Sequence, residues 1–400
     1  MRNGLYPLLA AQSLTAFADN AILFTAIAMV MHAHLGEWYV PALQSSFLIA
    51  FVVFAPWVGR WADRFSKPRV LIAGNLIKIV GTALTFLGVE PMVAYAVIGL
   101  GAAVYSPAKY GILPEMVGHN ELVKANGWIE GSTILAIIAG TVVGGYVADR
   151  SIHEALLATA VAYGASIAFT TLIPKLPARG VTAGAALPAF VHTLRTFLVS
   201  PRARFAMLGT SLFWGTAAVV RLLEVAWAPM VLMLDTAFDV SKLTLYLAIG
   251  IVVGAASASK LIPIEQLRRA RGAAYIMGGF ILILSTVEHL WPARGALFAI
   301  GMAGGIFVVP VNAALQEIGH KTVGSGGAVA IQQFFENAAM LVSVGIYTVA
   351  AAEHISPVAN LAGLGLLVMA MTFAVAWHLP KVDGEAVPLQ ADRALPPSNE

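Results

Sequence analysis

Long apolar segments separated by short polar loops constrain this 400-residue chain more than any other feature. Of its residues, 59% are hydrophobic and only 11% are charged, whereas a soluble domain carries about 25% charged residues. A helix needs about 20 apolar residues to cross about 30 Å of hydrocarbon, which leaves room for roughly a dozen crossings in a chain of this length. The composition therefore excludes a soluble globular protein and predicts an all-α, multi-pass membrane protein.

Glycines, prolines and clusters of charge divide the apolar segments into two sets of six. The first six spans are expected at 5–33, 41–59, 68–88, 91–112, 126–148 and 154–173. The second six are expected at 204–234, 242–262, 272–290, 295–316, 326–351 and 357–379. We therefore predict twelve transmembrane helices in two six-helix halves with pseudo-two-fold symmetry, a layout that resembles the major facilitator fold.

The loops set the domain division and the orientation. We expect the first half at 1–174, a cytoplasmic linker at 175–203, the second half at 204–379 and a disordered cytoplasmic tail at 380–400. Most of the 24 Lys and Arg residues fall on the side of the linker and both termini, so the positive-inside rule places that side in the cytoplasm. Apolar residues at helical spacing within 190–198 indicate a helix that lies either at the membrane interface or on the protein surface.

The loop after the second span carries a charge pattern that resembles the Gly-x-x-x-Asp-Arg-x-x-Lys/Arg signature of the major facilitator superfamily. Its residues are Gly59, Asp63, Arg64 and Lys67, with Arg69 close behind. A carboxylate here can face the positive amino-terminal end of a neighbouring helix, and the basic residues can pair with acids on the other half. We predict a conformational latch that stabilises one of two access states.

Four glycines in the fifth span suggest close helix packing. Gly131, Gly140, Gly144 and Gly145 resemble a glycine pattern of antiporters in the same superfamily, although the proline that usually follows the third position is replaced by Gly145. Small residues at such spacing let two helix backbones approach closely. Close packing explains the pattern without any antiport, and we favour that interpretation.

Ionisable residues inside the predicted spans indicate the functional region, because a charge at a helix centre costs about 2.5–3.5 kcal/mol unless it has a partner or water. Asp19 and Asn20 lie in the first span, Lys78 in the third, and Arg221 with Glu224 in the seventh. We expect Lys78 to be structural. Polar side chains of other spans complete a predicted substrate-binding set: Lys109, Tyr110, Asn312, Gln332 and Glu336.

A lining with both signs of charge suits a zwitterionic or anionic head group. Arg offers bidentate hydrogen bonds to phosphate, and a carboxylate can meet an ammonium group. We assign phosphate binding to Arg221 and Lys109. Asp19 is expected to bind the amine, to act as a gate, or to serve only as the counter-charge of a basic residue. A pair between Glu224 and Arg221 would weaken the phosphate role of Arg221.

Several longer stretches of sequence resemble the bacterial lysophospholipid transporters of this superfamily. They are Ala16 to Ala21, Tyr105 to Leu113, Leu122 to Gly127, Gly209 to Gly215 and Phe335 to Asn337. The resemblance extends from residue 10 to about residue 375. It implies flipping of lysophosphatidylethanolamine and lysophosphatidylglycerol from the outer to the inner leaflet of the inner membrane, by alternating access, for re-acylation.

The same resemblance implies the acyltransferase/acyl-carrier-protein synthetase as a functional partner. Membrane lipid surrounds the protein, and we expect a monomer with no cofactor, no metal and no nucleic-acid partner. A proton-coupled drug or metabolite antiporter, with Asp19 or Glu336 as the proton carrier, remains the alternative. An enzyme is disfavoured, since the sequence contains no His-x-x-x-x-Asp motif, no Gly-x-Ser-x-Gly elbow and no Gly-rich phosphate loop.

Overall fold

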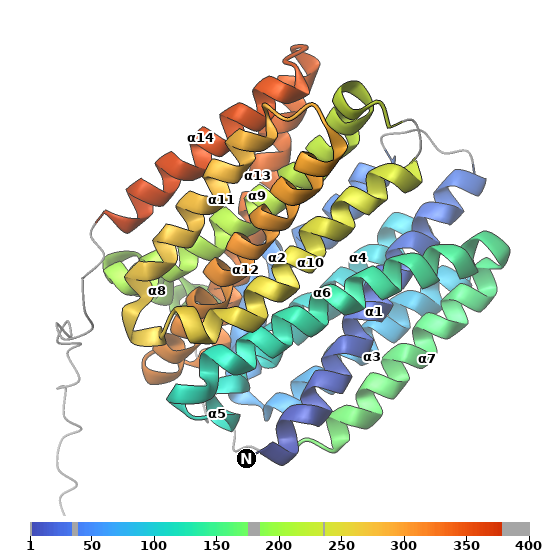
Figure 1. Cartoon of the computed structure of the whole chain (residues 1–400). Coiled ribbons are helices and arrows are strands. Elements are labelled where there is room, and N and C mark those ends of the chain that lie inside the picture. The colour runs from blue at the N-terminus through green and yellow to red at the C-terminus, as the bar shows by residue number, and fades with distance from the viewer. Residues whose placement is uncertain (1, 34–38, 175–184, 235–236, 378–400) are drawn as a thin grey trace, which may run out of the picture.

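The computed structural model describes residues 2–33, 39–174, 185–234 and 237–377. Within these ranges the regular structure is helical throughout (Figure 1). The first half contains α1 (Arg2–His32), α2 (Tyr39–Arg64), α3 (Lys67–Phe86), α4 (Pro91–Gly111), α5 (Leu113–Met116), α6 (His119–Arg150) and α7 (Ile152–Thr171). The predicted tail, 380–400, lies outside the described residues.

The second half follows a short connecting helix, α8 (Ala186–Val199). It contains α9 (Pro201–Leu232), α10 (Ala237–Leu261), the 3₁₀ helix η1 (Ile264–Arg269), α11 (Ala270–Leu284), α12 (Leu290–Lys321), α13 (Ser325–Ala352) and α14 (Pro357–Ala376). The described part of the linker is therefore helical, where the apolar spacing of 190–198 predicted a helix.

Eleven helices of the described chain are long and apolar enough to cross a membrane. The twelfth position belongs to α11, which has only 15 residues, because the chain forms η1 before it and turns after Leu284. The predicted span 272–290 therefore ended too late. Helices α6, α9 and α12 have 32 residues each and extend beyond their predicted spans. The all-helical, twelve-span fold is confirmed.

The two halves meet mainly along two helix pairs, α2 with α13 and α6 with α10, and α4 also contacts α13 and α6 contacts α12. We call the side where α1 begins, α2 ends and α8 lies the linker side, and the opposite side the far side (Figure 1). Close contacts between the halves lie near the linker side: Gly59 packs against Ala330, and Gly127 packs against the carbonyl of Ala255. On the far side, residues 338–352 of α13 are all at least partly exposed. The halves are thus closed at the linker side and separate toward the far side.

Two of the four glycines predicted to pack closely touch the backbone of α1. A Cβ atom at Gly140 would lie 3.0 Å from Phe17 Cα, and one at Gly144 would lie 2.9 Å from Ala21 Cβ. By contrast, a Cβ at Gly131 or Gly145 would meet nothing nearer than 3.9 Å. The α1–α6 contact within the first half therefore depends on Gly140 and Gly144.

A Gly140→Val substitution should destabilise the first half by about 1–3 kcal/mol, since the added methyl groups force α1 and α6 apart. We expect a lower melting temperature and a smaller monodisperse fraction in detergent, measured by size-exclusion chromatography after heating. Gly145→Val on the same helix is the matched control and should behave like the wild type. Equal losses in both variants would contradict the packing assignment.

Candidate functional site

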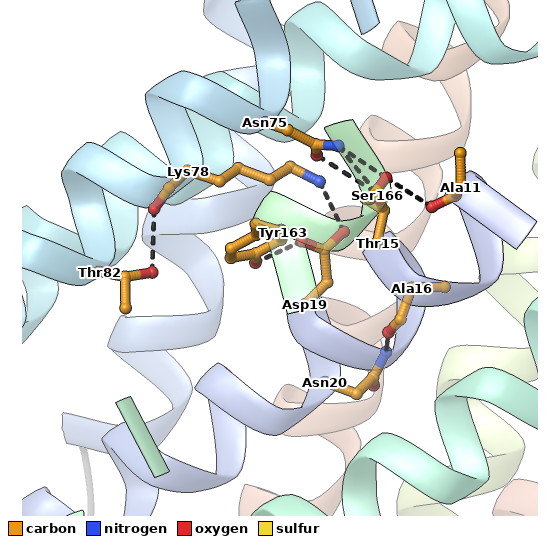
Figure 2. Close-up of polar contacts among 10 residues, drawn as sticks. All are labelled: Ala11, Thr15, Ala16, Asp19, Asn20, Asn75, Lys78, Thr82, Tyr163 and Ser166. Atoms are coloured by element: carbon orange, nitrogen blue, oxygen red, sulfur yellow. Dashed lines mark hydrogen bonds and ion pairs between the residues drawn. The ribbon is translucent and has the colours of Figure 1, made fainter. Parts of the chain in front are cut away.

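A buried ion pair joins α1 to α3 inside the first half. Lys78 Nζ lies 2.8 Å from Asp19 Oδ2, and the hydroxyl of Tyr163 donates to Asp19 Oδ1 at 2.7 Å (Figure 2). The Lys78 side chain is 1% exposed, whereas that of Asp19 is 22% exposed. Asp19 is therefore the counter-charge of Lys78 and also retains accessible surface.

Neutral polar groups surround this pair. Asn75 donates to the hydroxyls of Thr15 and Ser166 at 3.1 and 2.9 Å, and Ser166 in turn donates to the Ala11 carbonyl (Figure 2). Asn20 does not join them, because its amide donates to the Ala16 carbonyl of its own helix. The network fixes α1, α3 and α7 around the charges, since buried polar groups that lack partners are costly.

A second polar network crosses from one half to the other. The hydroxyl of Tyr110 and the amide of Asn312 both donate to Glu130 Oε1, at 2.9 and 3.1 Å. Gln332 donates to Asn312 Oδ1 and to Glu336 Oε1, both at 2.6 Å. We call these five residues the crossing network. Because Tyr110 and Glu130 belong to the first half and the other three to the second, the network bridges the two.

Lys109 is the cation of this region. Its ammonium lies 4.2 Å from the ring centroid of Tyr110 and interacts electrostatically with Glu130 and Glu336. Among the described residues, no carboxylate lies within ion-pair distance of it. The positive charge therefore sits beside two buried carboxylates without direct contact with either.

Arg221 and Glu224 share a helix but do not form an ion pair in the described chain. Arg221 is exposed. Glu224 is 2% exposed and accepts a hydrogen bond from Thr244 of α10 at 2.6 Å, while its other oxygen has no partner. The guanidinium group of Arg221 thus keeps its hydrogen-bonding capacity for another anion.

An apolar groove lies between α6 and α10. It has a volume of about 500 Å³, and its walls include Leu135, Val142, Leu245, Ile249 and Val252. Leu245 follows Thr244, the hydrogen-bond partner of Glu224, along α10. The groove therefore offers an apolar chain a lining of aliphatic side chains only, among the residues described.

The latch carboxylate Asp63 reaches the amino-terminal end of α13. The backbone N–H groups of Gly326 and Gly327 donate to its two oxygens, each at 2.8 Å. Gly324, just before α13, has a φ of 107°, and a Cβ there would lie 2.9 Å from Asp63 Cγ. Both the positive φ and the contact require glycine. Asp63 therefore accepts hydrogen bonds from N–H groups at the start of α13 that have no partner within that helix, and α13 belongs to the other half.

The basic latch residues behave differently from one another. Lys67 lies 2.9 Å from Asp63 and 3.7 Å from Glu115, so its described partners belong to its own half, not to the other half as the sequence suggested. Arg64 and Arg69 are exposed. In this state, Asp63 alone of the five predicted latch side chains hydrogen-bonds across the described interface between the halves, and Gly59 provides the close approach.

Two further contacts close the linker side. Asn126 and Gln316 exchange amide hydrogen bonds of 2.9 and 2.7 Å, and both are fully buried. His119 of α6 bridges Glu265 of η1 at 2.5 Å and Glu317 of α12 at 2.7 Å. A hydrogen bond from its own backbone and then one from His119 hold the pKa of the Glu265 carboxyl below its usual range. Its charged form therefore persists at neutral pH and is lost only in acid.

Glu130 is the residue of this site that the sequence analysis missed. It lies in the predicted span 126–148 and carries a charge, so the criterion applied to Asp19 identifies it as well. The partners Asn126, Thr244 and Tyr163 are ordinary in sequence, because nothing in a single sequence pairs residues so distant along the chain. Among the described residues, no group of three or more His, Asp or Glu side chains could hold a metal ion.

Comparison with known proteins identifies the class. The sequence profile of the Major Facilitator Superfamily matches residues 9–344. The human organic anion transporter MFSD10 has a similar structure, with a TM-score of 0.75, 12% sequence identity and coverage of 93% of this chain and 99% of that one. The fucose:proton symporter FucP of Escherichia coli gives a TM-score of 0.71 at 16% identity, covering 93% and 97%. The fold is that of the Major Facilitator Superfamily, whose members are transporters and not enzymes.

Curated relatives narrow the class to one family. The lysophospholipid transporter LplT of Klebsiella pneumoniae is 40% identical over 378 residues, which cover 94% of this chain and 95% of that protein. LplT of Escherichia coli is 42% identical over 380 residues, covering 94% and 96%. The chain belongs to the LplT family of the Major Facilitator Superfamily.

Removing the charge of Asp63 should loosen the linker side. A carboxylate at a helix amino-terminal end is worth about 0.3–2 kcal/mol, so Asp63→Asn should raise the open population about 2- to 30-fold. The chain contains no cysteine, so a single Ala330→Cys substitution, beside Gly59, reports opening by its rate of maleimide labelling. The exposed Arg69→Gln variant is the control. Unchanged labelling in Asp63→Asn would contradict the assignment.

Breaking the Asp19–Lys78 pair should be more harmful than removing it. Asp19→Asn leaves Lys78 buried and uncompensated, at a cost of about 3–5 kcal/mol, whereas replacing both charges is often neutral. We therefore expect the Asp19→Asn, Lys78→Met double variant to regain most of the thermal stability that Asp19→Asn loses. A double variant less stable than Asp19→Asn alone would show that the pair is not the main constraint on these side chains.

Proposed function

We propose that this protein flips lysophosphatidylethanolamine and lysophosphatidylglycerol from the outer to the inner leaflet of a bacterial inner membrane, by alternating access. The names of the relatives support lysophospholipids as the substrate class. The observation that carries the proposal is Arg221, an exposed cation of a membrane helix with no carboxylate partner among the described residues. Such a group needs an anion or water, and a phosphate satisfies it with bidentate hydrogen bonds.

The apolar groove between α6 and α10 supports a substrate with one acyl chain. A head group bound at Arg221 and Lys109 would place its chain near Leu245 and Ile249, in a groove whose described lining is aliphatic throughout. Keeping the chain against apolar walls avoids exposing it to water. Asn312, Gln332 and Glu336 offer further hydrogen bonds, and Asp19 or Glu224 would meet the ammonium of ethanolamine.

The proposed orientation puts the linker side in the cytoplasm, with both termini there, because Lys and Arg gather on that side. The structure then corresponds to a state closed toward the cytoplasm. We assign the first half to residues 1–174, the linker to 175–203 and the second half to 204–379. Opening of the linker side would release the head group into the inner leaflet, where an acyltransferase/acyl-carrier-protein synthetase would re-acylate it. We propose that the protein acts as a monomer.

The proposal is tested by uptake of labelled lysophosphatidylethanolamine into spheroplasts that express the protein, with and without a protonophore. Arg221→Ala should weaken uptake about 10- to 150-fold, because hydrogen bonds to a charged group contribute about 1.5–3 kcal/mol each. The Asp19→Asn, Lys78→Met double variant should fold and yet lose uptake if Asp19 also contacts the substrate. Arg69→Gln is the control for a surface charge.

The two candidate functions give different results. Protonophore-resistant uptake that Arg221→Ala loses supports the lysophospholipid flippase. The absence of uptake by well-folded wild-type protein would reject it and would favour the proton-coupled antiporter, in which a carboxyl inside a membrane helix, Asp19 or Glu336, carries the proton.

A further inference from the structure

Glu130 holds the two halves together within the membrane-crossing region. Its Oε1 atom accepts hydrogen bonds from Tyr110 of its own half, at 2.9 Å, and from Asn312 of the other half, at 3.1 Å. The side chain is 2% exposed. A buried carboxylate is costly unless a group of opposite charge lies near it. The stability of the Glu130–Asn312 contact therefore depends on which cation compensates the charge of Glu130.

Lys109 supplies that compensation indirectly. Its ammonium interacts electrostatically with Glu130 but lies against the ring of Tyr110, 4.2 Å from the centroid. The same tyrosine donates its hydroxyl to Glu130. Tyr110 therefore separates the two charges, and the ammonium of Lys109 keeps its own hydrogen-bonding capacity toward a further anion.

The other carboxylates near the middle of the helices do not join the halves. Asp19 is bonded to Lys78 and Tyr163, both in the first half. Glu336 accepts from Gln332 and Gln333, both in the second half. Asp63 does cross between the halves, but it does so at the end of α2, two helices away in sequence from Lys109. Glu130 alone combines a bond across the described interface with a position beside Lys109.

We propose that Glu130 couples head-group binding to opening of the linker side. The proposal rests on the lysophospholipid function: when the substrate phosphate binds Lys109, it takes over the positive charge that compensated Glu130. The buried carboxylate then becomes costly, and water reaches it once the Glu130–Asn312 bond breaks and the halves separate. Glu130 is thus a positioning residue, since it acts through Lys109 and Asn312 and not through contact with the substrate.

A Glu130→Gln variant separates coupling from binding. The amide oxygen of glutamine still accepts hydrogen bonds from Tyr110 and Asn312, so the contact between the halves remains. Glutamine has no negative charge, so phosphate binding at Lys109 leaves no buried charge uncompensated. In the Ala330→Cys background, lysophosphatidylethanolamine should accelerate maleimide labelling of the wild type about fivefold or more, the usual lower range for coupling between sites. Glu130→Gln should bind the lipid with an affinity within about threefold of wild type and yet show no acceleration.

Two further variants complete the test. Asn312→Ala removes the donor from the other half and should label quickly even without lipid, which keeps the proposal testable if Glu130→Gln folds poorly. Thr133→Val is the matched control, because Thr133 lies one helical turn from Glu130 on α6 and bonds to Gln12 and Ile129 inside the first half. It should respond to the lipid like the wild type.

The outcomes distinguish the coupling from the function. Acceleration by lipid in the wild type but not in Glu130→Gln, with binding retained, supports the coupling. Equal acceleration in both, or slow labelling of Asn312→Ala without lipid, overturns the coupling and leaves the lysophospholipid function standing. If the folded wild type neither binds lysophosphatidylethanolamine nor responds to it, the proposed function fails, and the coupling fails with it.

Discussion

The cost of an unpaired charge away from water is the constraint on which the rest of this structure depends. In hydrocarbon, each buried ionisable group must find a partner or a route to water. Lys78 forms an ion pair with Asp19. Glu336 accepts hydrogen bonds from the amides of Gln332 and Gln333, and Glu130 accepts them from Tyr110 and Asn312. The partners of Lys78 and Glu130 lie on other helices, so satisfying these two charges also fixes how the helices pack, whereas the partners of Glu336 lie on its own helix, α13. Arg221 differs from these groups because it is exposed, and its interaction with Glu224 is electrostatic without an ion pair between the two side chains in the described chain.

Closure of the linker side uses contacts that can be broken at moderate cost. Besides the close packing at Gly59 and Gly127, the described polar contacts of this interface are backbone N–H groups bonded to Asp63, one pair of amides, a histidine between two glutamates, and a serine hydroxyl that donates to Glu115. Every one of these groups can bond to water when the halves separate, so opening exchanges protein bonds for solvent bonds, and the net cost per bond is about 0.5–1.5 kcal/mol for neutral pairs. Such an interface suits a protein that alternates between two states, whereas a large apolar seam would resist separation.

The sequence predicts the fold well because the membrane simplifies the problem. Length, apolar content and the position of charged loops fix nearly every helix, and the error at α11 arose because the turn after Leu284 carries few breaking residues. The Asp63 contact was predictable from its spacing and the helix dipole. The sequence did not predict the pairing of Lys78 with Asp19 or the crossing network, because both depend on which helix faces which. It also left open whether Arg221 and Glu224 form an ion pair. Glu130 was within reach of the sequence criteria, since it is an ionisable residue inside a predicted span.

The most direct test of the account is the distance between the linker-side ends of the two halves in the presence of substrate. The distance is measured by double electron–electron resonance in lipid nanodiscs. The chain contains no cysteine, so the spin labels are attached to Arg69→Cys in α3 and Lys260→Cys in α10, both at exposed positions. We predict one dominant short distance without lysophosphatidylethanolamine and a second, longer distance when it is added. A distance distribution that the lipid leaves unchanged, in protein that binds it, would contradict transport by alternating opening of the linker side.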